Sequence, residues 1–128
     1  MFLDTTIIME ILRSKKRSKK FQEIFDLVKD EPLFISVIQL GEISDWCLDN
    51  EIDPLDRISR LKEVVGIVPL SERICLEGSE IKRWMRERGV SKFSVLDGII
   101  LVSARSIDQK LLTTDSDFRK AEDAIILD

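Results

Sequence analysis

Short apolar runs and longer amphipathic stretches alternate along the chain. The apolar runs occupy residues 1–4, 33–36, 67–70, 110–114 and 124–127. Runs of this length are typical of strands that are buried on both faces of a parallel sheet. Between them apolar residues return every three or four positions, which is the spacing of one helical face. The alternation predicts an α/β fold with helices on both sides of a central, mainly parallel sheet of about five strands.

The helices are predicted from their apolar spacing and from their end signals. Their approximate ranges are 5–12, 21–28, 37–49, 54–65, 71–89 and 95–106. Asp53 precedes Pro54, a common arrangement of N-cap and first helical residue. Gly66 is expected to end that helix after Val65, so that the next strand begins at Ile67.

Two capping-box patterns place acidic residues near helix starts. Ser36 is followed three residues later by Gln39, and Ser94 is followed in the same way by Asp97. In a capping box each side chain bonds the backbone amide of the other residue, which satisfies two amides that the first turn leaves unpaired. The patterns place Asp97 in the first turn of its helix and Glu42 in the second turn of the other.

Four acidic residues fall where α/β folds carry their function. Asp4 and Asp115 follow predicted strands, and Glu42 and Asp97 lie near helix starts. The carboxyl ends of parallel strands share one edge of the sheet, so these residues are expected to meet there. Taken singly, each also has a structural explanation as a cap, a turn residue or a solvated helix residue. Together they would repel one another unless cations share them, and oxygen-only ligands favour Mg²⁺ or Mn²⁺ over zinc.

Four segments resemble, in chain order, the four signature segments of PIN domains, the family that includes VapC-type toxins. The segments are FLDTTIIMEIL, ISVIQLGEI, VLDGIILVSA and LLTTDSDF, and they span nearly the whole chain. Each alone is common, whereas the ordered set is specific. The resemblance implies a single PIN domain over residues 1–128 with a three-layer α/β/α sandwich. It also implies that the catalytic positions correspond to Asp4, Glu42, Asp97 and Asp115.

Three further residues match less specific positions of the same family. Asp117 corresponds to a position that is often Asp or Asn, which implies a metal-binding set of Asp4, Asp97, Asp115 and Asp117. Thr113 corresponds to a threonine or serine of the last motif, and Thr5 to a small polar residue after the first Asp. Each also has a plain structural explanation, as a first-turn acid, a β-branched strand residue and a helix-start residue.

The resemblance implies a metal-dependent endoribonuclease that is the toxin of a VapBC-type pair. One or two Mg²⁺ or Mn²⁺ ions would activate water for attack on an RNA phosphodiester, leaving 3′-hydroxyl and 5′-phosphate ends. A homodimer and a VapB-type antitoxin are the implied protein partners. Two alternatives stay open, which are a non-toxin PIN nuclease in RNA processing or quality control and a PIN module that binds RNA or a partner without cutting.

Composition narrows the chemistry without revealing the substrate. The chain has no histidine and no tyrosine, which excludes imidazole bases, serine or cysteine triads and histidine-type ribonucleases. Its net charge of −4 comes from 20 basic and 24 acidic residues. Without the five acidic residues of the predicted site, 24 − 5 leaves 19 acidic against 20 basic residues. The predicted site can therefore account for the whole excess of acid, and the global charge is uninformative about the substrate.

A basic stretch near the N-terminus is a candidate for RNA contacts. It consists of Arg13, Lys15, Lys16, Arg17, Lys19 and Lys20. Such cations can hold phosphates by charge neutralisation, as could Arg105 or Arg119 near the acidic residues. The alternative is that the stretch is a solvated connector between two helices.

Two other Mg²⁺-dependent classes fit less well. The segment DSDF resembles the Asp-x-Asp motif of haloacid-dehalogenase phosphatases, but there the motif follows the first strand, whereas Asp115 lies near the end of this sequence. A receiver-like signalling module needs an acceptor Asp at the end of a mid-chain strand, and the strands here end in Ser36 and Leu70. No signal segment or stretch long enough to span a bilayer is found, so a soluble, cytoplasmic protein is expected.

Overall fold

Five parallel strands form one sheet in the computed structural model, which describes residues 1–13 and 18–128. Their order across the sheet is β3-β2-β1-β4-β5, and every neighbouring pair is parallel. The strands are β1 Phe2–Leu3, β2 Leu33–Ser36, β3 Val65–Val68, β4 Leu111–Thr113 and β5 Ala124–Ile126. The predicted parallel sheet of about five strands is therefore confirmed.

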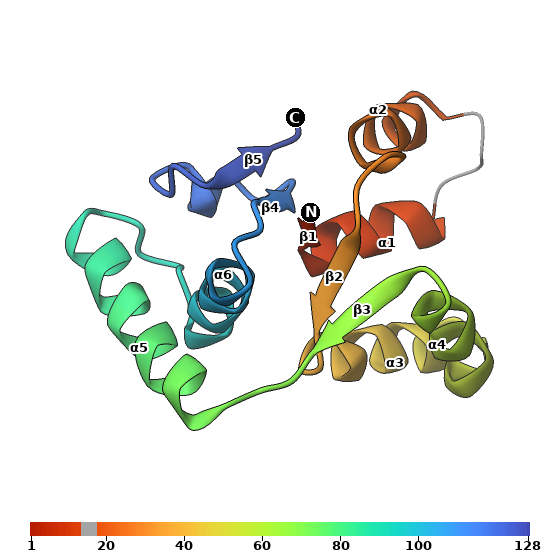
Figure 1. Ribbon diagram of the computed structural model, residues 1–128, viewed down its shortest axis with the longest axis horizontal. Helices are drawn as coiled ribbons and strands as arrows, with labels where there is room; N and C mark the ends of the chain where they lie inside the picture. Colours follow the sequence, from red (N-terminus) through yellow and green to blue (C-terminus); the bar gives the residue numbers. More distant parts are fainter. Residues whose placement is uncertain (14–17) are drawn as a thin grey trace.

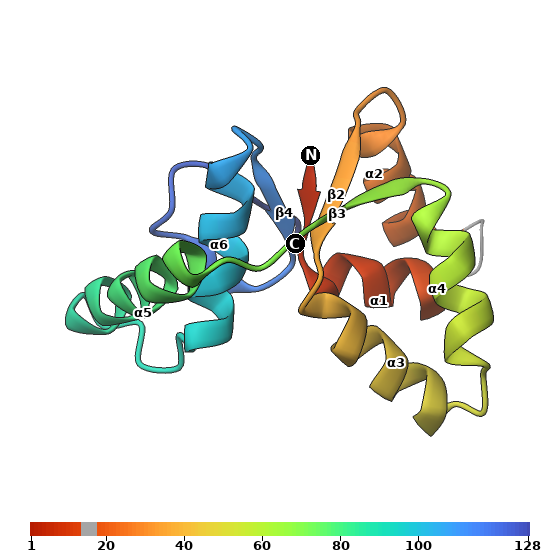
Figure 2. The ribbon, with the colours of Figure 1, turned by 60° about the horizontal axis from the view of Figure 1, so that its bottom comes forward.

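Helices cover both faces of this sheet. Within the described residues they are α1 Thr5–Arg13, α2 Lys19–Val28, α3 Gln39–Asp49, α4 Pro54–Lys62, α5 Glu72–Glu87 and α6 Val95–Ser106, with a 3-10 turn η1 at Ser116–Phe118. Helices α1 to α4 lie on one side of the strands and α5 and α6 on the other (Figures 1 and 2). The predicted three-layer α/β/α arrangement is confirmed.

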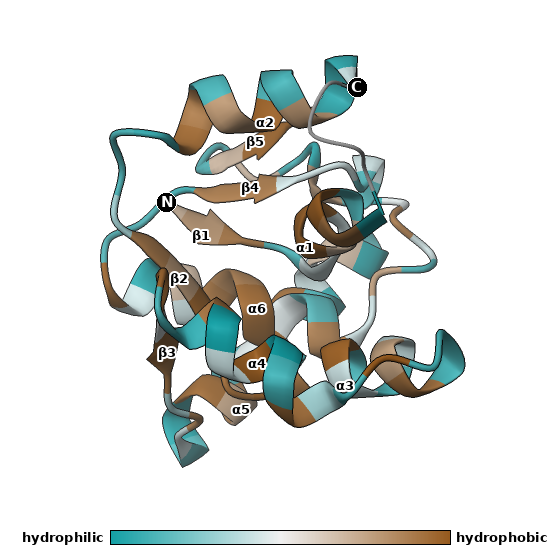
Figure 3. Cartoon of the chain, turned by 90° about the vertical axis from the view of Figure 1, so that its right-hand side faces the viewer, coloured by the Kyte–Doolittle hydropathy of each residue, from teal (hydrophilic) through white to brown (hydrophobic). Residues whose placement is uncertain are grey.

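The sheet is buried on both faces because its side chains supply two hydrophobic clusters. In β1, Leu3 contacts the cluster under α1 to α4, whereas Phe2 contacts the cluster under α5 and α6. Successive strand residues point to opposite faces, so both side chains are fully buried. Figure 3 shows the same distribution, with apolar residues concentrated on the strands and on α6. No helix of the described residues combines the length and apolar character that crossing a membrane requires.

The capping box predicted at the start of α3 is wrong in part. The Gln39 side chain does accept from the Ser36 amide, at 2.7 Å, but the Ser36 hydroxyl accepts from the Ile38 amide at 3.3 Å. The helix begins at Gln39, and its N-cap Ile38 has no side-chain cap. Glu42 consequently lies in the first turn rather than in the predicted second turn.

The boundary between α4 and β3 also differs from the prediction. The helix ends at Lys62, and Val65 and Gly66 belong to the strand. Pairing with β2 explains the difference, because β3 pairs with it over its whole length and aligns Gly66 with Phe34. A Cβ atom on Gly66 would lie 2.9 Å from the Phe34 ring, so the glycine allows a close cross-strand approach instead of ending a helix.

Helices α5 and α6 follow their predicted signals and pack very closely. Ser71 caps α5, and the predicted capping box of Ser94 and Asp97 opens α6. Gly78 of α5 and Gly98 of α6 face each other, since a Cβ atom on Gly98 would lie 2.1 Å from the Gly78 carbonyl oxygen. This contact fixes the start of α6, and with it Asp97, against the rest of the molecule.

Candidate active site

The first acidic side chain, Asp4, is buried directly after the central strand β1. Only 5% of its surface is exposed. Its Oδ2 atom accepts hydrogen bonds from the Thr113 hydroxyl at 2.6 Å and from the Thr6 hydroxyl at 3.1 Å. Burial raises the pKa of Asp4, the hydroxyls and the Thr5 backbone amide lower it, and the charge of Asp97 raises it, with a net upward shift. Hydrogen bonds thus fix the orientation of the Asp4 carboxylate, although the charge of Asp97 repels it.

The two hydroxyls that bond Asp4 also fix the chain after β4. Oγ1 of Thr113 accepts from the Asp115 backbone amide at 3.0 Å, and Oγ1 of Thr6 accepts from the Thr114 amide at 3.1 Å. Because β1 and β4 are parallel neighbours, these bonds join the carboxyl ends of both strands. They bring Asp115 to the edge of the sheet where Asp4 lies.

Glu42 approaches the same edge from the first turn of α3. The side chain is half-buried, and this burial raises the pKa of Glu42. A hydrogen bond from the Thr5 hydroxyl lowers that pKa, the charges of Asp4 and Asp97 raise it, and the net shift is upward. The Thr5 hydroxyl itself accepts from Nε2 of Gln39 at 3.3 Å. A chain of hydrogen bonds therefore orients Glu42.

Asp97 lies at the start of α6 and interacts with acids on both sides of it. Its Oδ2 accepts from the Ser94 amide at 2.9 Å, and its own amide donates to the Ser94 hydroxyl at 3.1 Å. The charge of Asp97 contributes to the raised pKa of Asp4, of Glu42 and of Asp117. Asp97 therefore lies close enough to affect each of these three acids.

Asp115 and Asp117 form a turn that closes the other side of the site. Oδ1 of Asp115 accepts from the Asp117 amide at 2.9 Å and caps η1. Burial raises the pKa of Asp117, the charges of Asp115 and Asp97 raise it further, and Lys92 lowers it. The capping explanation for Asp115 is thus correct, and it coexists with a position among the other acids.

These five residues are called the acidic cluster: Asp4, Glu42, Asp97, Asp115 and Asp117. All their ligand atoms are carboxylate oxygens, the donors that Mg²⁺ and Mn²⁺ prefer. Throughout residues 1–13 and 18–128, no basic side chain is among the groups that shift the pKa of Asp4 or Glu42, so a divalent cation fits as the counter-charge. In the same residues no three acidic or cysteine side chains converge closely enough to hold one ion. Ligation by three of them requires side-chain rotation.

Only part of the basic stretch can be placed relative to the acidic cluster. Arg13 lines a cavity of about 290 Å³ together with Thr5, Thr6 and Glu42. Lys19 is exposed on α2, and Lys20 donates from Nζ to the Asp128 backbone carbonyl. The predicted contacts Lys15, Lys16 and Arg17 lie outside the described residues.

Arg105, the basic residue near the acidic residues in the sequence, is already paired. Its guanidinium binds both carboxylate oxygens of Asp123, at 2.7 and 2.9 Å. The pair raises the pKa of Arg105 and lowers the pKa of Asp123. Arg105 therefore joins α6 to the segment before β5.

Comparison with known proteins identifies the family. A PIN domain family model matches residues 1–124. The chain belongs to the PIN domain family. This match confirms the resemblance that the four sequence segments indicate. No curated protein sequence matches this PIN domain.

Several solved structures share the fold of this PIN domain at low sequence identity. A toxin–antitoxin complex from Klebsiella pneumoniae is 17% identical with a TM-score of 0.76, and the alignment covers 97% of this chain and 94% of that chain. VapBC-1 from nontypeable Haemophilus influenzae is 23% identical with a TM-score of 0.74, covering 99% and 96%. VapBC2 from Rickettsia felis, bound to a DNA fragment from its promoter, is 17% identical with a TM-score of 0.74, covering 98% and 96%.

Sequence reasoning missed two polar residues that organise the PIN domain site. Thr6 bonds both Asp4 and the Thr114 amide. Gln39 is fully buried, and its Nε2 also donates to the Leu3 carbonyl at 2.8 Å. Thr6 repeats the residue type of Thr5 and gave no separate signal. Gln39 was detectable only as half of a capping box, although a glutamine on the buried face of a helix usually needs partners for its amide.

Proposed function

We propose that this PIN domain is a metal-dependent endoribonuclease acting as the toxin of a VapBC-type pair. The observation that carries the proposal is the environment of Asp4, a buried carboxylate held by two hydroxyls and repelled by Asp97. A carboxylate kept in such a field is stabilised when a divalent cation binds beside it. Family membership supports nuclease chemistry, and the proposal treats residues 1–128 as one domain.

In the proposed mechanism the acidic cluster divides into ligands and a water-positioning group. Asp4, Asp97, Asp115 and Asp117 would hold one or two Mg²⁺ or Mn²⁺ ions. The bound ion supplies a lowered pKa for the attacking water and a counter-charge for the phosphoryl oxygens. Glu42, whose pKa is raised in the metal-free protein, would accept a hydrogen bond from that water and orient it.

The remaining contacts position these groups. The Thr113 and Thr6 hydroxyls both donate to Oδ2 of Asp4, so neither of them bonds the other carboxylate oxygen. The Thr5 hydroxyl orients Glu42 in the same way. Positioning by hydroxyls leaves the negative charge of the acids in place, whereas a lysine in the same positions would neutralise it.

Cleavage of RNA by purified protein, with Mn²⁺ and with EDTA, tests the nuclease. Asp97→Asn keeps an oxygen that can accept from Ser94 but removes the charge, so we expect cleavage to fall by about 10² to 10³-fold. Asp108→Asn is the matched control, because Asp108 follows the opposite end of α6 and its φ of 54° suits asparagine equally well. Cleavage that persists in EDTA or in Asp97→Asn would contradict the proposal, and RNA binding without any cleavage would favour the non-catalytic PIN module.

The proposed partners are a second copy of the chain and a VapB-type antitoxin. The structural neighbours that are toxin–antitoxin complexes support an antitoxin, since the fold is shared over nearly the full length. Growth arrest of cells that express the wild-type chain, but not Asp97→Asn, tests the toxin role. Cleavage without growth arrest would favour a PIN nuclease in RNA processing or quality control.

A further inference from the structure

A positively charged cavity of about 330 Å³ adjoins the acidic cluster at Asp117. Two segments line it, the connection between α5 and α6 and the turn around η1. The polar and charged residues of its lining are Ser91, Lys92, Ser116, Asp117, Arg119 and Lys120. Three of them are cations and one is an anion, so 3 − 1 leaves a net charge of +2. Asp117 is the only acidic residue of this lining and belongs to both sites.

The cations of this cavity have little to bind within the described chain. Lys92, Arg119 and Lys120 are exposed. Arg119 lies 3.5 Å from a carboxylate oxygen of Asp128, whose side chain is 91% exposed, and ion pairs of this kind contribute little. Over the described ranges, 1–13 and 18–128, no ion pair within 4.0 Å involves Lys92 or Lys120. Their charges are therefore available to an external anion.

We propose that this cavity binds the phosphodiester backbone of an RNA strand next to the phosphate that is cut. The inference rests on the proposed ribonuclease function and deepens it by assigning a substrate site. A strand whose scissile phosphate lies at the acidic cluster passes its neighbouring phosphates into the cavity, because Asp117 joins the two. Lys92, Arg119 and Lys120 then neutralise successive phosphates, and the Arg119 guanidinium can bond two oxygens of one phosphate.

An RNA strand suits this arrangement better than an acidic protein segment does. An RNA strand can use both neighbouring sites, since the cations bind its backbone and the acidic cluster is the proposed place of cleavage. An acidic protein segment could bind only the cations. Backbone neutralisation is also independent of base sequence. The cavity therefore sets where the strand lies and not which sequence is chosen.

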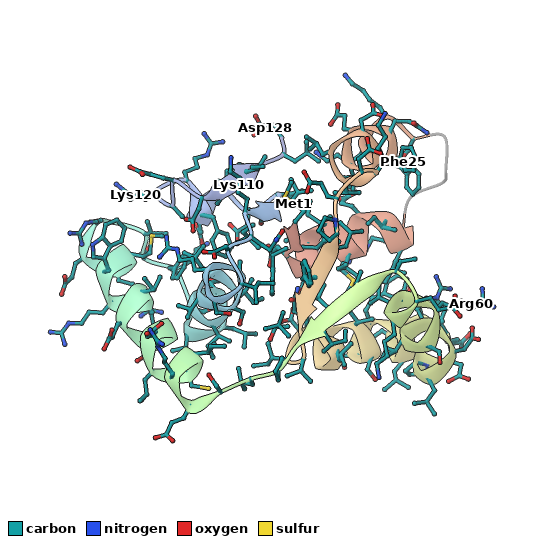
Figure 4. All side chains as sticks on the ribbon, viewed as in Figure 1. Met1, Phe25, Arg60, Lys110, Lys120 and Asp128 are labelled. Atoms are coloured by element: carbon teal, nitrogen blue, oxygen red, sulfur yellow. The ribbon has the colours of Figure 1, made fainter. Side chains whose placement is uncertain are left out.

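The salt dependence of RNA binding tests the proposal. A labelled single-stranded RNA of mixed sequence is titrated with protein in EDTA, so that cleavage does not affect the binding curve. The slope of log K against log salt falls by about 0.7 for each phosphate contact removed, so Lys92→Gln/Arg119→Gln/Lys120→Gln is expected to lose about 2 from the slope. The matched control, Lys29→Gln/Arg60→Gln/Lys62→Gln, removes the same charge elsewhere on the surface. Figure 4 shows Arg60 at the opposite end of the molecule from Lys120.

Each outcome of this experiment has one meaning. A slope that falls in the cavity variant and not in the control supports the cavity. Equal slopes in all three proteins, equal losses in both variants, or no RNA binding by the wild type overturns it. Displacement of RNA by polyglutamate as effectively as by unlabelled RNA would also overturn it and point to an acidic protein segment. Wild-type protein that binds RNA with the expected slopes but does not cut it with Mn²⁺ overturns the nuclease and leaves the cavity standing.

Discussion

Hydroxyl groups, rather than positive side chains, hold the buried acids of this PIN domain. A lysine or arginine beside Asp4 would lower its pKa and stabilise the fold, but it would also occupy the place of a metal ion. Thr113 and Thr6 orient the carboxylate without cancelling its charge, and its pKa stays raised. At the scale of single residues the proposed metal site therefore keeps its negative charge at some cost in stability.

Removing one hydroxyl at a time distinguishes the effect of Thr5 on the pKa of Glu42 from the effect of Thr6 on the pKa of Asp4. Thr5→Val removes the donor to Glu42, and the pKa of Glu42 is expected to rise because its charged form loses a hydrogen bond. Thr6→Val removes a donor to Asp4 and should raise the pKa of Asp4 instead. Each variant is the control for the other in a ¹³C NMR titration of the carboxyl groups in EDTA. Equal shifts of both acids in both variants would show that the threonines act indirectly.

The acidic residues could be predicted from the sequence more readily than the residues that hydrogen-bond them. Asp4, Glu42, Asp97 and Asp115 combine residue type with position at strand ends and helix starts, and both properties are visible in a sequence. The role of Thr6 depends on the Thr114 amide coming within 3.1 Å of its hydroxyl, with the two residues 108 apart along the chain. No local pattern carries that information.

At the scale of elements, the contact of α5 with α6 is the most demanding in the fold. Gly78 and Gly98 bring the two helix backbones together, and the start of α6 carries Asp97. A change in this contact would therefore alter both the stability of the fold and the position of an acid that three other acids share as a neighbour.

Gly98→Ala is expected to lower the free energy of unfolding by about 1–3 kcal/mol or more, because the added methyl group overlaps the Gly78 carbonyl at 2.1 Å. Gly41→Ala is the matched control on α3, where nothing lies within 4 Å of the added Cβ. There the gain in helix propensity should stabilise the protein by about 0.5–1 kcal/mol. Urea unfolding measures both. Similar effects of the two substitutions would contradict the close helix contact.

Element types were predictable from periodicity, whereas two boundaries were not. Val65 continues the apolar spacing of α4, so the local pattern favours a helix there, but pairing with Leu33 places it in β3. Ser36 and Gln39 form only half of a capping box, because the Ser36 hydroxyl accepts from the Ile38 amide rather than from the Gln39 backbone amide. At Val65 the contact with a distant strand outweighs the local preference.

At the scale of the whole molecule, the acidic cluster opposes folding at neutral pH. Asp4 and Glu42 have ordinary pKa values of 3.8 and 4.5, and both are raised in the folded protein. The folded state therefore binds more protons than the unfolded state between those values and the raised ones. Stability is highest below this window and is lost as the pH rises through the folded pKa values.

We therefore expect metal-free protein to become more stable as the pH is lowered from 7 towards about 4.5. Asp4→Asn should raise the free energy of unfolding at pH 7 and flatten this dependence, since the buried charge is removed. Asp123→Asn is the control, because the pKa of Asp123 is lowered and its contribution is lost only as the pH falls below its ordinary value of 3.8. Urea unfolding at several pH values, in EDTA, is the measurement. A wild-type stability that rises from pH 4.5 to 7 would refute the expectation.

The central strand β1 precedes the other four strands along the chain, but one of its two neighbours, β4, is the fourth strand. It pairs with β2 and with β4, and the hydroxyl that fixes Asp4 belongs to Thr113, 109 residues further along. Contacts of such long sequence separation are slow to form, because the intervening chain must first be closed into a loop. On the ribosome, a growing chain exposes Asp4, Glu42 and Asp97 well before the strand that joins them is synthesised. The assembled acidic cluster thus appears only when synthesis has passed β4, and an interrupted translation product cannot contain it.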